Sequence, residues 1–309
     1  MKHLPLKNRN YTELQKKYSL YLERIGYHKQ TCRLLPSMTR EFFHFLEGGS
    51  VEDLKRVSSK EIMEYYQYLK TRPNYRGAGS LSQSMQHMHI WNLRILFSYL
   101  LKEGTISVDP MGALKFPRPE KKERLVLSEK EIERLYKASE CFKDRALLGL
   151  FYGCGLRKSE AEALNVRDIS FKGRVLYVRS GKGKRRRVIP LPGRVIEDLK
   201  GYYYQERVHV VHKQPGGAKD TQLAFLLNKT GTRMMGQSLW KRLRYLTLKS
   251  GVKDPQRVTL HCLRHSIATH LLERGVGIEQ VRDFLGHTHL ESTQGYTRVN
   301  QKHLTDSLK

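Results

Sequence analysis

The sequence predicts a mainly α-helical protein with a small β-sheet, divided into a helical first domain and a mixed α/β second domain. Through most of the chain, apolar residues recur at steps of three and four, which is typical of amphipathic helices. Around the turn 181–184 the pattern changes to the alternation of a β-hairpin. A stretch rich in proline and charge, 105–127, reads as a linker. We therefore expect domains over residues 1–104 and 128–309.

The first domain is expected to be a compact bundle of four helices. Capping residues and glycines indicate where each helix begins or ends. The expected helices are one over 12–27 capped by Thr12 and Gln15, one ending at Gly48 and Gly49, one beginning at Ser58 with Glu61, and one running from near Ser80 with Gln83 to Gly104.

The second domain is expected to combine helices with one hairpin. The hairpin strands are the β-rich runs that carry Val175, Tyr177, Arg187 and Ile189. Residues 206–221 are interpreted as a loop that ends near Gly216 and Gly217. The expected helices begin at Ser128 with Glu131, cover 145–152, begin near Arg157, and cover 194–204, 237–249, 261–274 and 278–285.

The charge of the chain indicates a polyanionic partner. Its 309 residues carry 57 Lys and Arg against 30 Asp and Glu, a net charge of +27. Solubility needs far less charge, and self-repulsion does not help folding. Both parts are basic: residues 1–104 hold 17 basic and 9 acidic residues, and residues 105–309 hold 40 and 21. We therefore expect the partner to touch both domains.

Several other classes of protein are disfavoured. The sequence has no apolar run long enough to cross a membrane and no secretory signal, so a cytoplasmic protein is expected. The four cysteines are scattered, which indicates reduced thiols: Cys32, Cys141, Cys154 and Cys262. No phosphate-binding loop of the nucleotide-binding type is apparent, and His261 and His265 lack the further groups of a metal site. We expect no metal and no cofactor.

One set of polar residues suits phosphoryl chemistry. Arginines give charged, bidentate donors to phosphate oxygens, histidine moves protons near neutral pH, and a tyrosine hydroxyl beside cations can act as a nucleophile. Taken singly, each residue has a plainer interpretation as a surface salt bridge, a solvated helix face or a packing residue. The set comprises Arg157 with Glu160, Lys182 at the hairpin tip, His261 with Arg264, His287 after Leu285 and Gly286, and Tyr296.

The order and spacing of these residues resemble the tyrosine recombinase, or lambda integrase-like, family. The resemblance is strongest over residues 155–299 and is carried by GLRKSEAEAL (155–164), GKGKRRRVIPL (181–191), HCLRHSIATHLLERG (261–275) and VRDFLGHTHLESTQGYTRV (281–299). The first domain is similar, more weakly, to the family's SAM-like core-binding domain. The length is similar to that of Xer-type and other simple two-domain members.

The resemblance implies a role for each matching residue. Arg157 and Arg264 would bind the scissile phosphate, and Glu160 would brace the site. Lys182 would protonate the leaving 5′ oxygen, with Lys184 as the rival. His261 and His287 would assist proton transfer and phosphate binding, and Tyr296 would be the nucleophile. The neighbouring hairpin charges would contact the DNA backbone: Lys184, Arg185, Arg186 and Arg187.

The implied activity is site-specific DNA recombination without ATP or a divalent metal. A 3′-phosphotyrosyl intermediate would form, and strands would exchange through a Holliday junction within a tetramer assembled on double-stranded DNA. The free protein would be a monomer or weak dimer in a bacterial cytoplasm, associated with the nucleoid when bound, and a mobile-element enzyme is the expected role. A type IB topoisomerase and a catalytically silent DNA-binding protein are the alternatives. Gly295 departs from the family pattern, which usually has a larger residue before the tyrosine.

Overall fold

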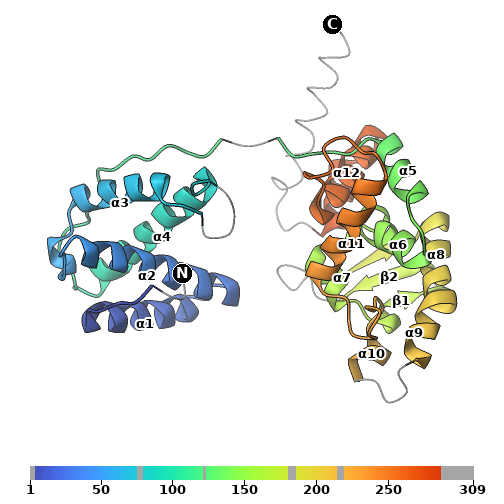
Figure 1. The fold of residues 1–309 in the computed structure, drawn as a ribbon, viewed down its shortest axis with the longest axis horizontal. Helices are drawn as coiled ribbons and strands as arrows, with labels where there is room; N and C mark the ends of the chain where they lie inside the picture. Colours follow the sequence, from blue (N-terminus) through green and yellow to red (C-terminus); the bar gives the residue numbers. More distant parts are fainter. Residues whose placement is uncertain (1–3, 75–78, 121–122, 180–185, 214–218, 287–309) are drawn as a thin grey trace, which may run out of the picture. The chain divides into compact units, whose positions relative to one another are not determined.

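The chain divides into two compact units, residues 1–122 and 123–309, in a computed structural model (Figure 1). The structure describes residues 4–74, 79–120, 123–179, 186–213 and 219–286. Within these ranges the protein is mainly helical with a three-stranded sheet in the second unit, so the predicted fold class is confirmed. The boundary between the units falls inside the stretch 105–127 that the sequence marks as a linker.

Four long helices form the first unit. They are α1 (Arg9–Arg24), α2 (Lys29–Gly48), α3 (Ser59–Thr71) and α4 (Gln83–Lys102), with a short 3₁₀ turn at Leu54–Arg56. All four contribute buried aromatic and aliphatic side chains to one core. Burial of that apolar surface holds the bundle together, at roughly 25 cal/mol per Å² removed from water.

The helix starts in the first unit show which capping predictions hold. Ser58 and Glu61 form the expected capping box, in which the Ser58 backbone N–H donates to Glu61 Oε2 at 2.7 Å. The Thr12 and Gln15 box is wrong, because α1 begins earlier, at an Asn8 side chain that accepts the Asn10 backbone N–H at 2.8 Å. Gln15 instead donates to the backbone carbonyl of Pro36, at 2.7 Å.

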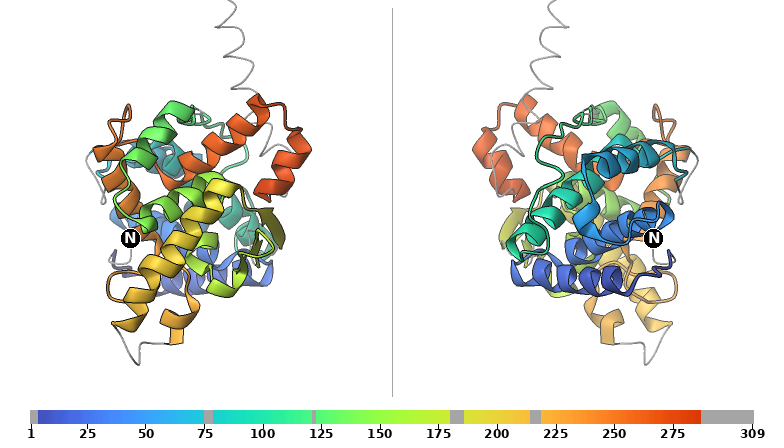
Figure 2. Two further views of the ribbon diagram at one scale, coloured as in Figure 1. Left: turned by 90° about the vertical axis from the view of Figure 1, so that its right-hand side faces the viewer. Right: turned by 90° about the vertical axis from the view of Figure 1, so that its left-hand side faces the viewer.

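The second unit has a small antiparallel sheet at one edge of its helices (Figures 1 and 2), and Tyr177 and Val188 on the sheet are exposed. Val178 pairs with Arg187 and Val175 with Pro190, which confirms the hairpin, and the two-residue strand β1 adds an edge that the sequence does not reveal. The elements are α5 (Glu129–Lys137), α6 (Phe142–Leu148), α7 (Lys158–Ala163), β1 (Ile169–Ser170), β2 (Val175–Val178), β3 (Arg187–Pro190), α8 (Gly193–Lys200), α9 (Val208–His212), α10 (Lys219–Leu223), α11 (Gly236–Lys249), α12 (Leu260–Glu273) and α13 (Ile278–Leu285).

The prediction of a loop over residues 206–221 is wrong where the structure describes it. A π-helical turn, Gly201–Arg207, continues α8 directly into α9, and α10 begins at Lys219. The buried Arg207 side chain donates to the backbone carbonyls of Thr221 and Ala224 at 2.8 and 2.9 Å. These charged hydrogen bonds stabilise the contact between the end of the π-helical turn and the residues in and just after α10.

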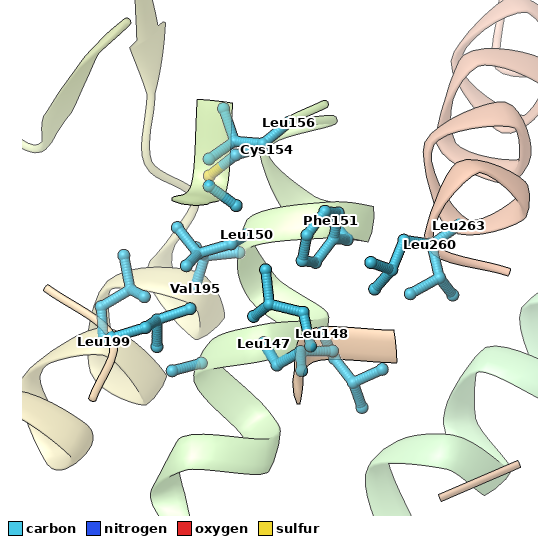
Figure 3. Close-up of a cluster of buried hydrophobic side chains, with 14 of the residues drawn as sticks. Leu147, Leu148, Leu150, Phe151, Cys154, Leu156, Val195, Leu199, Leu260 and Leu263 are labelled. Atoms are coloured by element: carbon cyan, nitrogen blue, oxygen red, sulfur yellow. The ribbon is translucent and has the colours of Figure 1, made fainter. Parts of the chain in front are cut away.

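Helix α6 runs through the centre of the second core (Figure 3). Leu147, Leu148 and Phe151 are fully buried, and they lie among side chains from α8 and α12. A second π-helical turn, Gly149–Gly153, carries α6 towards residues 155–157, and the Leu156 N–H donates to the Leu150 carbonyl at 3.0 Å. The core therefore fixes the position of the turn that precedes Arg157.

No helix in the described ranges is long and apolar enough to cross a membrane.

Candidate active site

Glu160 lies at the centre of the candidate site. Its side chain is 1% exposed and receives hydrogen bonds from the Arg157 backbone N–H at 2.9 Å and from Arg157 Nη1 at 2.7 Å. Arg187 Nη1 and Nη2 donate to its two carboxylate oxygens at 3.0 and 2.8 Å. Arg264 Nη1 lies 4.0 Å from Glu160 Oε2. One buried carboxylate thus gathers three arginines that come from three different elements.

The arginines keep Glu160 ionised. Burial alone would raise the pKa of this carboxyl group, because a buried charge is desolvated. The hydrogen bonds and charge of Arg187, together with the donors of Arg157, outweigh burial and lower the pKa of Glu160 to about 2. Three guanidinium groups around one carboxylate leave an excess of positive charge, which suits a phosphate diester.

The C-terminal end of α13 contacts the same three arginines through its backbone carbonyls. Three consecutive backbone carbonyls each accept one hydrogen bond from a different arginine: Phe284 from Arg187 Nε at 3.0 Å, Leu285 from Arg264 Nη2 at 2.6 Å and Gly286 from Arg157 Nη2 at 2.7 Å. These carbonyls have no partner within their own helix, and cations are favoured at a helix C-terminus. Helix α13 also lies against α12 and β3 (Figure 2).

Helix α12 supplies Arg264 and His261 on neighbouring turns. Arg264 is 1% exposed and also donates through Nη1 to the Gly155 carbonyl. His261 is exposed, and its ring lies edge-on to that of His265, with centroids 4.1 Å apart. Desolvation by the surrounding protein, followed by the charges of Arg264, Arg124 and Arg157, lowers the pKa of His261. The ring is therefore biased towards its neutral form, which can accept a proton.

Comparisons with known proteins identify the family. The model of the phage integrase family matches residues 125–303. The chain belongs to the phage integrase family. It is 30% identical over 298 residues to the tyrosine recombinase XerD of Oceanobacillus iheyensis, covering 88% of this chain and 97% of that protein. It is 30% identical over 301 residues to the tyrosine recombinase XerA of Pyrococcus horikoshii, covering 96% and 93%.

Solved structures share the fold of this recombinase. One is the XerH site-specific recombinase bound to a palindromic difH substrate, with a TM-score of 0.70, 20% identity and coverage of 98% of this chain and 89% of that one. A lambda integrase dimer bound to a core site matches with a TM-score of 0.68 and 18% identity, covering 92% and 94%. At these identities the structures support the fold, whereas the curated relatives support the activity. The chain is a site-specific tyrosine recombinase, and the topoisomerase and silent-binder alternatives are not favoured.

The structure brings together part of the predicted site. Arg157 is hydrogen-bonded to Glu160, Arg264 forms an ion pair with the same carboxylate, and His261 lies close enough for both arginines to lower its pKa. The remaining predicted residues lie outside the described ranges: Lys182, Lys184, Arg185, His287 and Tyr296. Arg186 is described and exposed.

Arg187, which the sequence predicts as a DNA backbone contact, lies against other protein groups in the structure. Its side chain is only 9% exposed, and its donors reach Glu160 and the Phe284 carbonyl instead of the surface. A signal for this position existed in the sequence, because Arg187 and the buried Ile189 are two residues apart on one strand and share a face. The run of charges around Arg187 concealed that alternation.

No group of three or more His, Cys, Asp or Glu side chains that could hold a metal ion occurs in the part of the chain that the structure describes.

Gly155 offers a test of how tightly the site is packed. Its φ is +58°, and a Cβ atom there would lie 2.9 Å from Leu285 Cδ2 and 3.2 Å from Phe284 Cε1. Gly155→Ala is therefore expected to lower the free energy of unfolding by about 2–4 kcal/mol, from left-handed strain plus overpacking. Gly251→Ala is the matched control, because φ is +65° and no atom lies within 4 Å of its Cβ position. Equal losses in urea unfolding would contradict the packing argument.

Proposed function

We propose that this recombinase cuts one strand of duplex DNA at a specific site, with the Tyr296 hydroxyl attacking the scissile phosphate. The P–O5′ bond breaks as the Tyr296–phosphate bond forms, and Lys182 gives a proton to the leaving 5′ oxygen. The 5′ hydroxyl of a partner strand then reverses the step. The energy of the broken bond is kept in the 3′-phosphotyrosyl link, so the exchange needs no ATP.

The observation that supports this proposal is the convergence of Arg157 and Arg264 on the buried Glu160. Guanidinium groups held in place by a protein framework stabilise the charge that develops on a phosphorane without reorganising during the reaction. The Glu160 hydrogen bonds and the α13 carbonyls supply that framework. We assign His261, whose lowered pKa favours the neutral ring, as the acceptor of the tyrosine proton, and His287 would donate to a phosphate oxygen.

The larger assembly follows from the same reaction. Exchange of two strand pairs requires four nucleophiles, and therefore a tetramer on two duplexes, built from monomers or weak dimers. We assign residues 1–104 to core binding, 105–127 to the linker and 128–309 to catalysis. The positive charge carried by both parts supplies phosphate contacts, with Lys184, Arg185 and Arg186 among them. We expect such an enzyme to work in a bacterial cytoplasm, where it associates with the nucleoid.

The covalent intermediate provides the test. Nicked suicide duplexes made from the DNA that flanks this gene should trap an adduct, and it should form in EDTA. Trypsin would release the peptide 283–298, in which Tyr296 is the single tyrosine, so mass spectrometry of the DNA-linked peptide identifies the nucleophile. The link should survive mild alkali, unlike a phosphoserine or phosphothreonine bond. An adduct on any other peptide, or cleavage that needs a divalent metal, would overturn the proposal.

A further inference from the structure

Arg187 joins the two halves of the active-site framework. From the start of β3 it donates to both oxygens of Glu160, at 3.0 and 2.8 Å, and through Nε to the Phe284 carbonyl, at 3.0 Å. Arg157 and Arg264 donate to the next two carbonyls of the same helix end. Arg187 therefore links the carboxylate that orients Arg157 to the end of α13.

The packing around Gly286 supports a fixed position for Arg187. Gly286 ends α13 with a φ of +65°, and a Cβ atom there would lie 2.9 Å from Arg187 Nη1 and 3.0 Å from its Cδ. The arginine side chain thus lies directly against the backbone from which the chain continues into His287. Both its donors and its aliphatic stem are engaged with protein atoms.

We propose that Arg187 is a positioning residue for strand cleavage, which holds Glu160 in place against Arg157 and fixes the end of α13. This inference rests on the proposed function, because the reaction it serves is the attack on the scissile phosphate. Arg187 does not need to touch the DNA to do this. Its loss should slow the cleavage step in the bound complex and leave the affinity for DNA nearly unchanged.

Single-turnover cleavage of the nicked suicide duplex, at saturating protein, separates these effects. Arg187→Gln is expected to lower the cleavage rate constant roughly 10²-fold, the cost of misplacing a reacting group by about 1 Å. Arg187→Lys keeps the charge but cannot bridge Glu160 and the Phe284 carbonyl, so an intermediate rate is expected. Arg274→Gln is the control, because Arg274 forms an exposed ion pair with Glu129. This variant should cleave DNA at the wild-type rate.

The salt dependence of binding decides between positioning and phosphate contact. The log–log slope of affinity against salt should be the same for Arg187→Gln and the wild type. A slope smaller by about one unit, with wild-type cleavage at saturation, would show that Arg187 is a phosphate contact and would overturn the inference. If Arg187→Gln fails to fold, the cleavage rate and the salt slope of Arg187→Lys are compared with those of the wild type instead.

A readout on the free protein keeps this inference separate from the proposed function. Among the described residues, the charged groups that face Glu160 are Arg187 from β3, Arg157 from the start of α7 and Arg264 from α12. Removing Arg187 should raise the pKa of Glu160, which carboxyl NMR measures without any DNA. A wild-type protein that forms no adduct would contradict the proposed function alone. An unchanged pKa together with wild-type cleavage in Arg187→Gln would contradict the role of Arg187 alone.

Discussion

Arg264→Met is expected to remove both strand cleavage and a large part of the stability of the second unit. The arginine is 1% exposed and donates to the Gly155 and Leu285 carbonyls, with Glu160 beside it. Methionine fills similar volume but leaves those carbonyls and part of the Glu160 charge uncompensated. Losing one partner of a buried charged network costs about 3–5 kcal/mol.

The catalytic loss should exceed what destabilisation explains. Removing an arginine that stabilises the transition state of phosphoryl transfer lowers the rate by about 10³-fold or more. Adduct formation should therefore be measured at a temperature where circular dichroism shows the variant folded. Arg244→Met is the matched control, because Arg244 also donates to a backbone carbonyl, that of Pro255, outside the site. A folded Arg264→Met protein that cleaves at the wild-type rate would rule out the phosphate-binding role.

The parts of the fold that could be predicted are those with a local cause. Ser58 with Glu61 and Ser128 with Glu131 form the capping boxes that their spacing indicates, because a capping box depends on four consecutive residues. The π-helical turns at Gly149–Gly153 and Gly201–Arg207 could not be predicted in this way. A π turn adds a residue to one turn and shifts the apolar face, so the periodicity of the helix predicted over 194–204 ends inside the turn Gly201–Arg207, although the helix continues into α9.

The active site was predictable to the extent that its residues are close in sequence. Arg157 with Glu160 and His261 with Arg264 are recognisable as pairs because the two members of each are three positions apart on a helix or at its start. The position of Arg187 depends on Glu160, 27 residues away, and on Phe284, 97 residues away. No local sequence pattern specifies which distant carboxylate an arginine on a strand will bind. The contacts of Arg187 with Glu160 and Phe284 are therefore seen only in the folded chain.

Glu160→Gln is expected to cost about 3 kcal/mol of unfolding free energy near neutral pH, the equivalent of lowering a carboxyl pKa from 4.5 to about 2. The glutamine amide keeps the shape but cannot neutralise three arginines. Glu133→Gln is the control, since Glu133 forms an exposed pair with Arg194 and should cost less than about 1 kcal/mol.

The stabilisation that ionised Glu160 provides should depend on pH, and the direction of its pKa shift determines where that stabilisation is lost. A carboxyl group whose pKa is depressed in the folded state contributes stability that is present above its unfolded pKa and is lost as the pH falls towards the folded value. The difference in unfolding free energy between wild type and Glu160→Gln should therefore be full near neutral pH and shrink as the pH falls below 4.5 towards about 2. Urea unfolding across that range measures it. A difference that stays constant would mean that the glutamine disturbs packing, and that the charge of Glu160 does not hold the arginines together.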